Sequence, residues 1–109
     1  MNFEIHPAEV KKMIERGEAV KLIDVREVAE HQICNIEGAE LIPMGTIPEQ
    51  VSRLEEEADN ALLVIFCHHG ARSMNVVSWL RGNGIENCVS MAGGIDGWSA
   101  LVDPSVPRY

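Results

Sequence analysis

The stretch that most constrains the fold of this chain is the apolar run "ALLVIFC", residues 61–67. Its apolar side chains stand at consecutive positions and not at every second one, which indicates a strand covered on both faces. Such strands lie inside parallel sheets, where each connection between neighbours needs a crossover, usually a helix. The run is also too short to span a bilayer. We therefore expect an α/β fold built around this strand, and no interaction with a membrane.

The segments on both sides of this run alternate between strand-like and helical patterns. Strands are predicted at residues 19–25, 39–43, 61–67 and 86–91, and helices at residues 6–17, 26–33, 46–58, 73–84 and 95–101. This alternation predicts a mainly parallel central sheet flanked by helices on both faces. The chain has 109 residues without repeats or linkers. We expect a single domain over residues 1–109, with an irregular tail at 103–109.

Local signals place the ends of two helices. Pro7 suits a first helical turn, and Gly17 is placed to end that helix. Thr46 and Glu49 have the spacing of a capping box for the helix at 46–58. The helical side chains expected to face the core are Val10, Met13, Ile14, Val51, Leu54, Val76, Val77 and Leu80, and Trp79 and Trp98 are expected to pack in the core or as a lid.

The charge balance restricts the partners of this chain. Nine basic and seventeen acidic residues give a net charge of −8, which repels phosphate backbones and argues against nucleic acid. To bind an anionic ligand, the chain needs a local positive site that overcomes the negative electrostatic field of its net charge. The amino terminus lacks the pattern of a signal peptide, and three cysteines without paired spacing argue against a disulfide framework. These features predict a reducing, cytoplasmic setting.

The sequence "CHHGARS", residues 67–73, carries the strongest chemical signal. Cys67 ends the buried strand and a helix begins near Ser73, so the turn aims backbone N–H groups at one spot. Gly70 allows the backbone conformations of such a turn, and the amides favour a thiolate, the nucleophilic form of cysteine. Arg72 adds a fixed charge and a fork of donors suited to an oxyanion. With His68, His69 and Ala71, these residues form a predicted cradle for a thiolate and an anionic substrate.

Less specific interpretations exist for several of these residues. A cysteine at a strand end is often a buried structural thiol, although the glycine and arginine after Cys67 favour a functional one. His68 and His69 follow Cys67 too closely to share a metal ion with it, so we expect no metal or other cofactor and place both at the rim. Asp24 is expected to cap backbone donors and Arg26 to pair with an acidic neighbour, which gives both a supporting role, with a direct catalytic role as the alternative.

Four segments together resemble single-domain rhodaneses, a sulfurtransferase family, over essentially the whole chain. They are "LIDVRE" (22–27), "IEGAELIP" (36–43), "CHHGARS" (67–73) and "MAGGIDGW" (91–98), which are similar in order and spacing to the family's motifs. The chain departs from the family at Cys34 and Asn35, where rhodaneses often have Gly-His. Cys34 is expected to pack in the core, with resolution of an oxidised Cys67 as the alternative, and Cys88 is expected to be a core residue.

The resemblance implies a two-step reaction. Cys67 would attack the outer sulfur of an anionic donor such as thiosulfate, release sulfite and hold the sulfur as a persulfide. A thiophilic acceptor, such as cyanide, a thiol or a sulfur-carrier protein, would then take it. The tail "VDPSVPRY" is similar to the end of rhodanese domains fused to enzymes that adenylate sulfur-carrier proteins. This resemblance adds a carrier protein to the acceptors, and the choice among them stays open because the loop does not specify it.

Two other functions stay open at this point. Phosphatases and oxyanion reductases of the related fold have a cysteine loop of their own, and the phosphatases have five residues between the cysteine and the arginine. This chain has four, His68 to Ala71, and the shorter loop suits a single sulfur atom. A non-catalytic rhodanese-like binding module is the second alternative, which the presence of both Cys67 and Arg72 disfavours.

Overall fold

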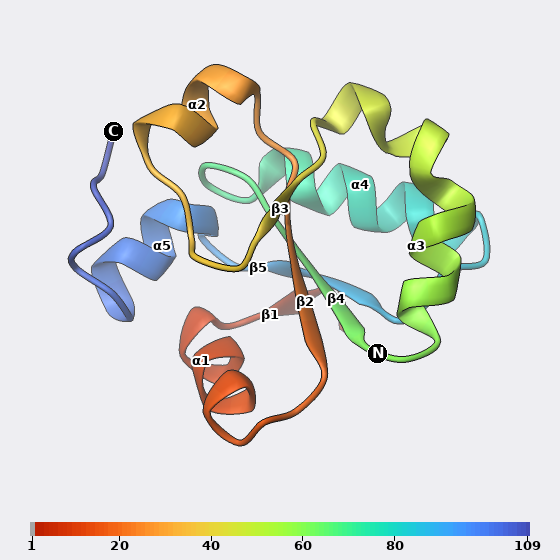
Figure 1. Cartoon of the computed structure of the whole chain (residues 1–109), viewed down its shortest axis with the longest axis horizontal. Coiled ribbons are helices and arrows are strands. Elements are labelled where there is room, and N and C mark those ends of the chain that lie inside the picture. Colours follow the sequence, from red (N-terminus) through yellow and green to blue (C-terminus); the bar gives the residue numbers. More distant parts are fainter. Residues whose placement is uncertain (1) are drawn as a thin grey trace.

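The computed structural model describes residues 2–109, which form an α/β fold around one five-stranded sheet (Figure 1). All strand pairs are parallel, and the strand order is β1-β5-β4-β2-β3. The strands are β1 (Glu4–Ile5), β2 (Val20–Asp24), β3 (Glu40–Leu41), β4 (Leu62–Phe66) and β5 (Cys88–Met91). The helices are α1 (Pro7–Glu15), α2 (Val28–Ile33), the 3-10 helix η1 (Met44–Gln50), α3 (Val51–Ala58), α4 (Ala71–Gly82) and α5 (Gly94–Leu101).

The apolar run predicted to be central is the middle strand, β4. It pairs with β2 on one side and β5 on the other, in a register that aligns Ile65 with Ile23 and Ser90. Residues 63–66 are fully buried. Because successive side chains of a strand point to opposite faces, β4 contributes to two separate cores. The predicted parallel sheet with helices on both faces is confirmed.

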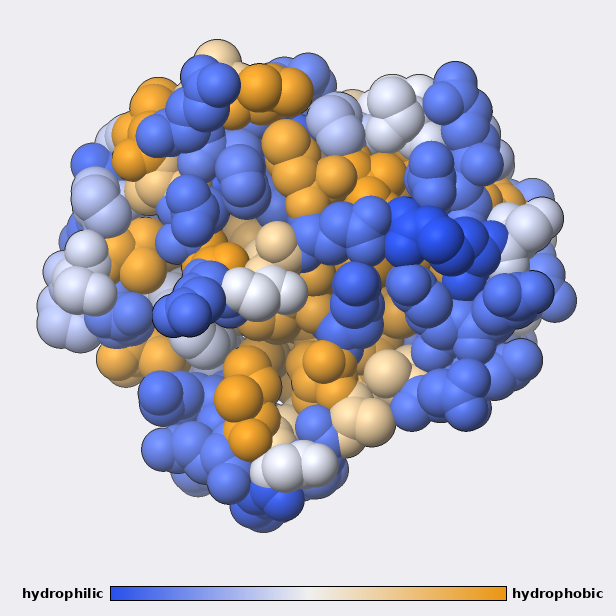
Figure 2. Space-filling view, viewed as in Figure 1, coloured by the Kyte–Doolittle hydropathy of each residue, from blue (hydrophilic) through white to orange (hydrophobic). Residues whose placement is uncertain are grey.

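The two faces of the sheet are covered by different helices. Leu63 and Ile65 pack in a cluster with side chains of η1, α3 and α4. Val64 and Phe66 pack in a second cluster with side chains of α1 and α5. The short helix α2 buries no residue and lies beyond the carboxyl end of β2. Mainly hydrophilic side chains cover the side of the molecule that carries α3, where the sequence is rich in glutamate (Figure 2).

The helix predicted at 46–58 differs in its first half. Residues 44–50 form the 3-10 helix η1, and the α-helix α3 begins only at Val51. The Thr46 hydroxyl donates to the Pro43 carbonyl at 2.8 Å. The predicted capping box of Thr46 and Glu49 is therefore wrong, because the chain is already in helical turns at Thr46, whose hydroxyl bonds back to a preceding carbonyl.

Two further expectations need correction at the surface, and one strand was not predicted. Ile14 is 43% exposed, because α1 reaches the core through its earlier residues Pro7 and Val10. Trp79 is 41% exposed on α4, whereas Trp98 is buried as expected. The edge strand β1 was not predicted, since two residues are too short for any periodic pattern.

The carboxyl ends of the parallel strands lie at one edge of the sheet. The segments that follow the strands and the carboxyl-terminal tail meet at this edge. Residues 103–109, which were predicted to be irregular, contain turns and extended chain and return toward α2 (Figure 1). Among the residues that the structure describes, no helix has both the length and the apolar character needed to cross a membrane.

Candidate active site

Cys67 directly follows the central strand β4, and its thiol is 1% exposed. The Sγ atom accepts hydrogen bonds from the backbone N–H groups of Gly70, at 3.1 Å, and of Ser73, at 3.4 Å. Backbone amides that converge on one atom stabilise negative charge on it. The loop and the first turn of α4 therefore form a site that can hold a sulfur anion.

The conformation of this loop depends on Gly70. Its φ of +119° lies in a region that residues with a Cβ rarely adopt. Gly70 is the last residue before α4, so its conformation turns the chain from β4 into the helix within a few residues. Ala71 begins α4, and its side chain is exposed. The glycine thus brings its own N–H and that of Ser73 to the same sulfur.

Ser73 and Ser90 connect the loop to the neighbouring strand β5. Both residues are fully buried. The Ser73 hydroxyl donates to the Gly70 carbonyl at 3.1 Å, lies 2.7 Å from Ser90 Oγ and lies 3.5 Å from Cys67 Sγ. These contacts hold the loop against the sheet and add a hydroxyl to the surroundings of the sulfur.

The start of α5 packs against the same loop through Gly94. The N–H groups of Ile95 and Asp96 donate to the carbonyls of Cys67 and His68, at 2.9 and 3.1 Å. Gly94 has a φ of +59°, and a Cβ at this position would overlap both carbonyl groups. The "MAGGIDGW" segment therefore needs a glycine here so that the backbone of α5 can approach the loop.

The Arg72 side chain forms a two-pronged ion pair with Glu30 of α2. Arg72 Nη1 and Nη2 donate to the two carboxylate oxygens at 2.7 and 2.9 Å. These bonds, opposed by burial and supported by the Glu27 N–H and the Tyr109 hydroxyl, lower the pKa of Glu30 to about 2. Arg72 also lies close enough to Cys67 for an electrostatic interaction. The predicted donor fork is thus present beside the sulfur, with both Nη groups engaged by Glu30.

Asp24 and Arg26 form a fully buried ion pair at the end of β2. The shortest contact, between Arg26 Nη2 and Asp24 Oδ2, is 2.7 Å, and Asp24 Oδ1 accepts the Arg26 backbone N–H at 3.0 Å. The expected capping by Asp24 and pairing of Arg26 are confirmed. Arg26 also donates to the carbonyls of Glu30 and Cys34, and His31 Nδ1 lies 3.0 Å from Asp24. The pair therefore fixes α2, which carries Glu30.

His68 and His69 lie at the rim of the loop, stacked in a row with Tyr109. The ring centroids of His68 and His69 are 3.9 Å apart, and the Tyr109 ring stacks on His68 at 3.8 Å with an interplanar angle of 4°. His69 is exposed, and its Nδ1 lies 3.8 Å from the Asp96 carboxylate. His68 Nε2 is buried without a hydrogen-bond partner among the described residues.

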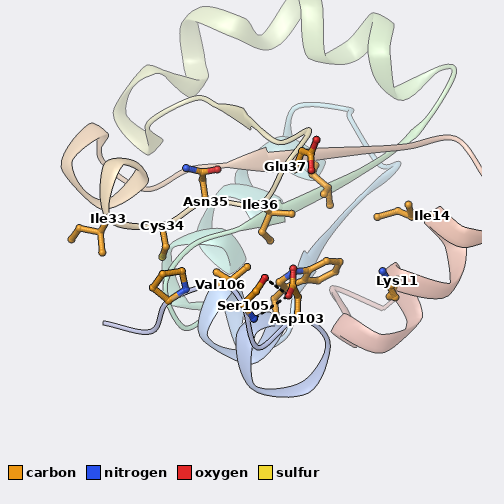
Figure 3. A pocket seen from close by; sticks show the side chains of 13 residues that line it. Lys11, Ile14, Ile33, Cys34, Asn35, Ile36, Glu37, Asp103, Ser105 and Val106 are labelled. Atoms are coloured by element: carbon orange, nitrogen blue, oxygen red, sulfur yellow. Dashed lines mark hydrogen bonds between the residues drawn. The ribbon is translucent and has the colours of Figure 1, made fainter.

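A cavity away from the cysteine loop has no contact with Cys67. It has a volume of about 650 Å³ and lies between α1, the segment 33–37 and the tail (Figure 3). Cys34 and Asn35 lie in its wall. Cys34 is buried in the cluster on the opposite face of the sheet from Cys67, which supports the packing role. Cys88 is fully buried, as expected, and burial raises the pKa of its thiol.

Three residues of the site were not identified from the sequence, namely Glu30, Ser90 and Tyr109. Glu30 and Tyr109 are 79 positions apart, and Ser73 and Ser90 are 17 apart, so no local spacing connects them. For Tyr109, the only signal was the resemblance of the tail to the end of fused rhodanese domains. Within residues 2–109, no three His, Cys, Asp or Glu side chains are arranged to hold a metal ion.

Comparisons with known proteins identify the family of this chain. The model of the rhodanese-like domain family matches residues 6–101. "Putative sulfurtransferase YtwF" of Bacillus subtilis is 38% identical over 101 residues, which cover 93% of this chain and 94% of YtwF. "Adenylyltransferase and sulfurtransferase MOCS3-2" of Zea mays is 34% identical over 105 residues, which cover 93% of this chain. The large relatives from plants and Mycobacterium tuberculosis are matched over only 22% to 30% of their own length.

Comparison with solved structures shows a similar fold. The crystal structure of a rhodanese-like domain protein from Staphylococcus aureus superposes with a TM-score of 0.81 at 31% identity, covering 99% of both chains. The family match covers strands β2 to β5, the Cys67 loop and all of α5, and it begins just after β1. From its sequence and its fold, this chain belongs to the rhodanese-like domain family, which includes the relative named "Putative sulfurtransferase YtwF".

Proposed function

We propose that this chain transfers sulfane sulfur through a persulfide on Cys67. The observation that carries the proposal is the placement of Cys67 Sγ at the end of β4, where the N–H groups of Gly70 and Ser73 donate to it. These donors suit a thiolate before the reaction and the outer sulfur anion of a persulfide after it. The same site serves both half-reactions because the negative charge stays within the loop.

The proposed donor is an anion such as thiosulfate. The Cys67 thiolate attacks the outer sulfur, a new S–S bond forms, and the S–S bond of thiosulfate breaks as sulfite leaves with the electron pair. In the second step, an acceptor such as cyanide or a thiolate attacks the outer sulfur, and Cys67 leaves as a thiolate. No redox partner is needed, since each step exchanges one nucleophile for another.

Arg72 and the histidines are proposed to bind the donor. Because Glu30 engages one N–H of each Nη group of Arg72, a sulfonate group has to displace one of these contacts or bind through the three remaining N–H groups of the guanidinium. His68 and His69 provide further donors at the rim. Arg72 thus contributes its charge to the site at all times and its hydrogen bonds when the donor enters.

A protein is the proposed physiological acceptor. The maize relative is named for adenylyltransferase and sulfurtransferase activities, which are combined in one chain. We propose that the present chain gives its sulfur to a carrier protein, in a reducing cytoplasm where its three cysteines stay free. Cyanide and small thiols then serve as substitutes in assays.

Parallel assays separate this function from the alternatives. We expect turnover with thiosulfate and cyanide and none with an aryl phosphate, since only four residues separate Cys67 from Arg72. Turnover of the phosphate would indicate a phosphatase, and no reaction with either substrate would indicate a binding module.

Mass spectrometry of the intact protein tests the intermediate. Thiosulfate without an acceptor should add one sulfur atom, which cyanide or dithiothreitol should remove. Cys67→Ser should abolish this adduct, whereas Cys34→Ser and Cys88→Ser, the matched controls at the two other buried thiols, should retain it. An adduct that persists in Cys67→Ser would contradict the assignment.

A further inference from the structure

Tyr109 contacts both the ion pair and the loop beside Cys67, although it lies far from them in the sequence. Its hydroxyl donates to Glu30 Oε2 at 2.8 Å and accepts a hydrogen bond from Arg26 Nη1 at 3.0 Å. Its ring stacks on His68, the residue after the nucleophile. The carboxyl end of the drawn chain lies beside α2 (Figure 1). One side chain therefore connects β2, α2 and the loop.

The direction of these hydrogen bonds gives the contact its effect. Arg26 is fully buried and cannot move easily, and as it donates to the phenol oxygen, the phenol proton is left to point to Glu30. Each carboxylate oxygen of Glu30 then has two donors. Oε1 accepts from Arg72 Nη1 and the Glu27 N–H, and Oε2 accepts from Arg72 Nη2 and Tyr109. This arrangement fixes the plane of the carboxylate and hence the guanidinium of Arg72.

We propose that Tyr109 is a positioning residue of the sulfur-transfer site, whose hydroxyl orients Glu30 and, through it, the charge of Arg72 beside Cys67. The inference rests on the proposed function of Cys67. Tyr109 touches neither the sulfur nor, in our proposal, the donor. It acts through Glu30 with its hydroxyl and through His68 with its ring.

Other contacts also hold the tail in place. The positioning role of the Tyr109 hydroxyl can therefore be separated from a merely structural role in attaching the tail. Arg108 Nε and Nη2 donate to the Asp96 carboxylate at 2.9 and 3.0 Å, and the Ser99 hydroxyl donates to the Val106 carbonyl. The tail therefore remains attached when the Tyr109 hydroxyl is removed. Arg108→Ala, which loosens the tail without touching Glu30, is the matched control.

The first measurement is the rate of persulfide formation with thiosulfate in single-turnover mass spectrometry. Tyr109→Phe keeps the ring and should slow this step about tenfold, as expected for the loss of a hydrogen bond to a charged group. Arg108→Ala should stay within about twofold of the unmodified protein. In the Arg72→Ala background, Tyr109→Phe should have no further effect, since the hydroxyl acts through Arg72. An unchanged rate in Tyr109→Phe, or equal losses in both backgrounds, would overturn the proposal.

The second measurement does not depend on sulfur chemistry. Tyr109→Phe removes one donor from Glu30, so the titration of its carboxyl carbon in NMR should move to higher pH, whereas Arg108→Ala should leave it in place. If this titration moves but the unmodified protein forms no persulfide, the proposed function fails and the role of Tyr109 in it falls as well. If persulfide forms normally and the titration stays in place, only the inference on Tyr109 is overturned.

Discussion

At the scale of single residues, Arg72 and the backbone amides of the loop have different partners. Arg72 pairs with Glu30, whereas the N–H groups of Gly70 and Ser73 donate to Cys67 Sγ. Backbone donors need no reorganisation when charge develops, because the fold holds them in place. Arg72 can therefore serve binding of the donor while the amides serve the sulfur.

The fork of Arg72 can be tested by Arg72→Lys, which keeps the charge but loses the paired contact. We expect kcat/KM for thiosulfate to fall at least about tenfold, while the free energy of unfolding changes by about 1 kcal/mol or less, as is usual for partly exposed ion pairs. Steady-state kinetics and urea unfolding measure the two quantities.

Arg53→Lys is the matched control for this change. Arg53 donates to both carboxylate oxygens of Glu40, at 3.0 and 2.7 Å, and lies on α3, outside the site. It should lose a similar amount of stability with unchanged kinetics. Equal kinetics for Arg72→Lys and the unmodified protein would show that the pairing of Arg72 with Glu30 is structural.

At the scale of elements, the site depends on two turns that end in helices. The loop after β4 supplies the donors to the sulfur, and the turn after β5 brings the first residues of α5 against the carbonyls of that loop. The N–H groups used in both cases are the ones that a helix leaves free at its start. Two adjacent parallel strands therefore build one site from the amino-terminal ends of two helices.

Gly94→Ala tests the close approach of α5. The new methyl group would overlap the carbonyls of Cys67 and His68, so we expect a loss of more than about 3 kcal/mol in the free energy of unfolding, together with slower persulfide formation. Gly84→Ala controls for backbone strain, since Gly84 has a φ of +89° with open space around its Cβ position. It should cost about 1 kcal/mol and leave the activity intact. Similar losses in both variants would contradict the proposed overlap.

The elements that could be predicted were those with a strong pattern of their own. β4 is apolar throughout, and α4 places Val76, Val77 and Leu80 inward as its spacing requires. The 3-10 helix η1 could not be separated from α3 because both have a helical spacing of side chains. β1 has only two residues and is defined by its pairing with β5, which a local pattern does not contain.

At the scale of the whole molecule, the site joins segments from most of the chain. Cys67 directly follows β4, Glu30 comes from α2, Arg72 from α4 and Tyr109 from the tail. The cysteine loop could be predicted from the sequence because its residues are contiguous. Glu30, the partner of Arg72, could not be predicted, since sequence alone does not show that α2 lies at the carboxyl edge of the sheet beside α4.

Acid unfolding should report the Glu30 ion pair. The pKa of Glu30 is lowered from 4.5 to about 2, so the pair stabilises the fold fully above pH 4.5 and progressively less as the pH falls toward 2. The difference in free energy of unfolding between the unmodified protein and Glu30→Gln should therefore be largest near neutral pH and shrink below pH 4.5. Urea unfolding over this range measures it.

In the difference between the unmodified protein and Glu30→Gln, the contributions of the other carboxylates to the pH dependence cancel. Glu40 and Asp103 also have lowered pKa values and titrate equally in both proteins. A difference that is independent of pH would show that Glu30 does not titrate as an ion-paired group.

The two backbone N–H groups that donate to Cys67 Sγ can be followed by NMR. The resonance of an amide proton responds to the charge of the atom that accepts it, so the Gly70 and Ser73 signals of a ¹⁵N-labelled sample should track the chemical state of the sulfur. One amide belongs to the loop and the other to the first turn of α4. Joint movement of both signals indicates a change at the sulfur, whereas movement of one indicates a shift of the backbone. The two amide signals thus report the chemical state of the sulfur without a chemical probe attached to the protein.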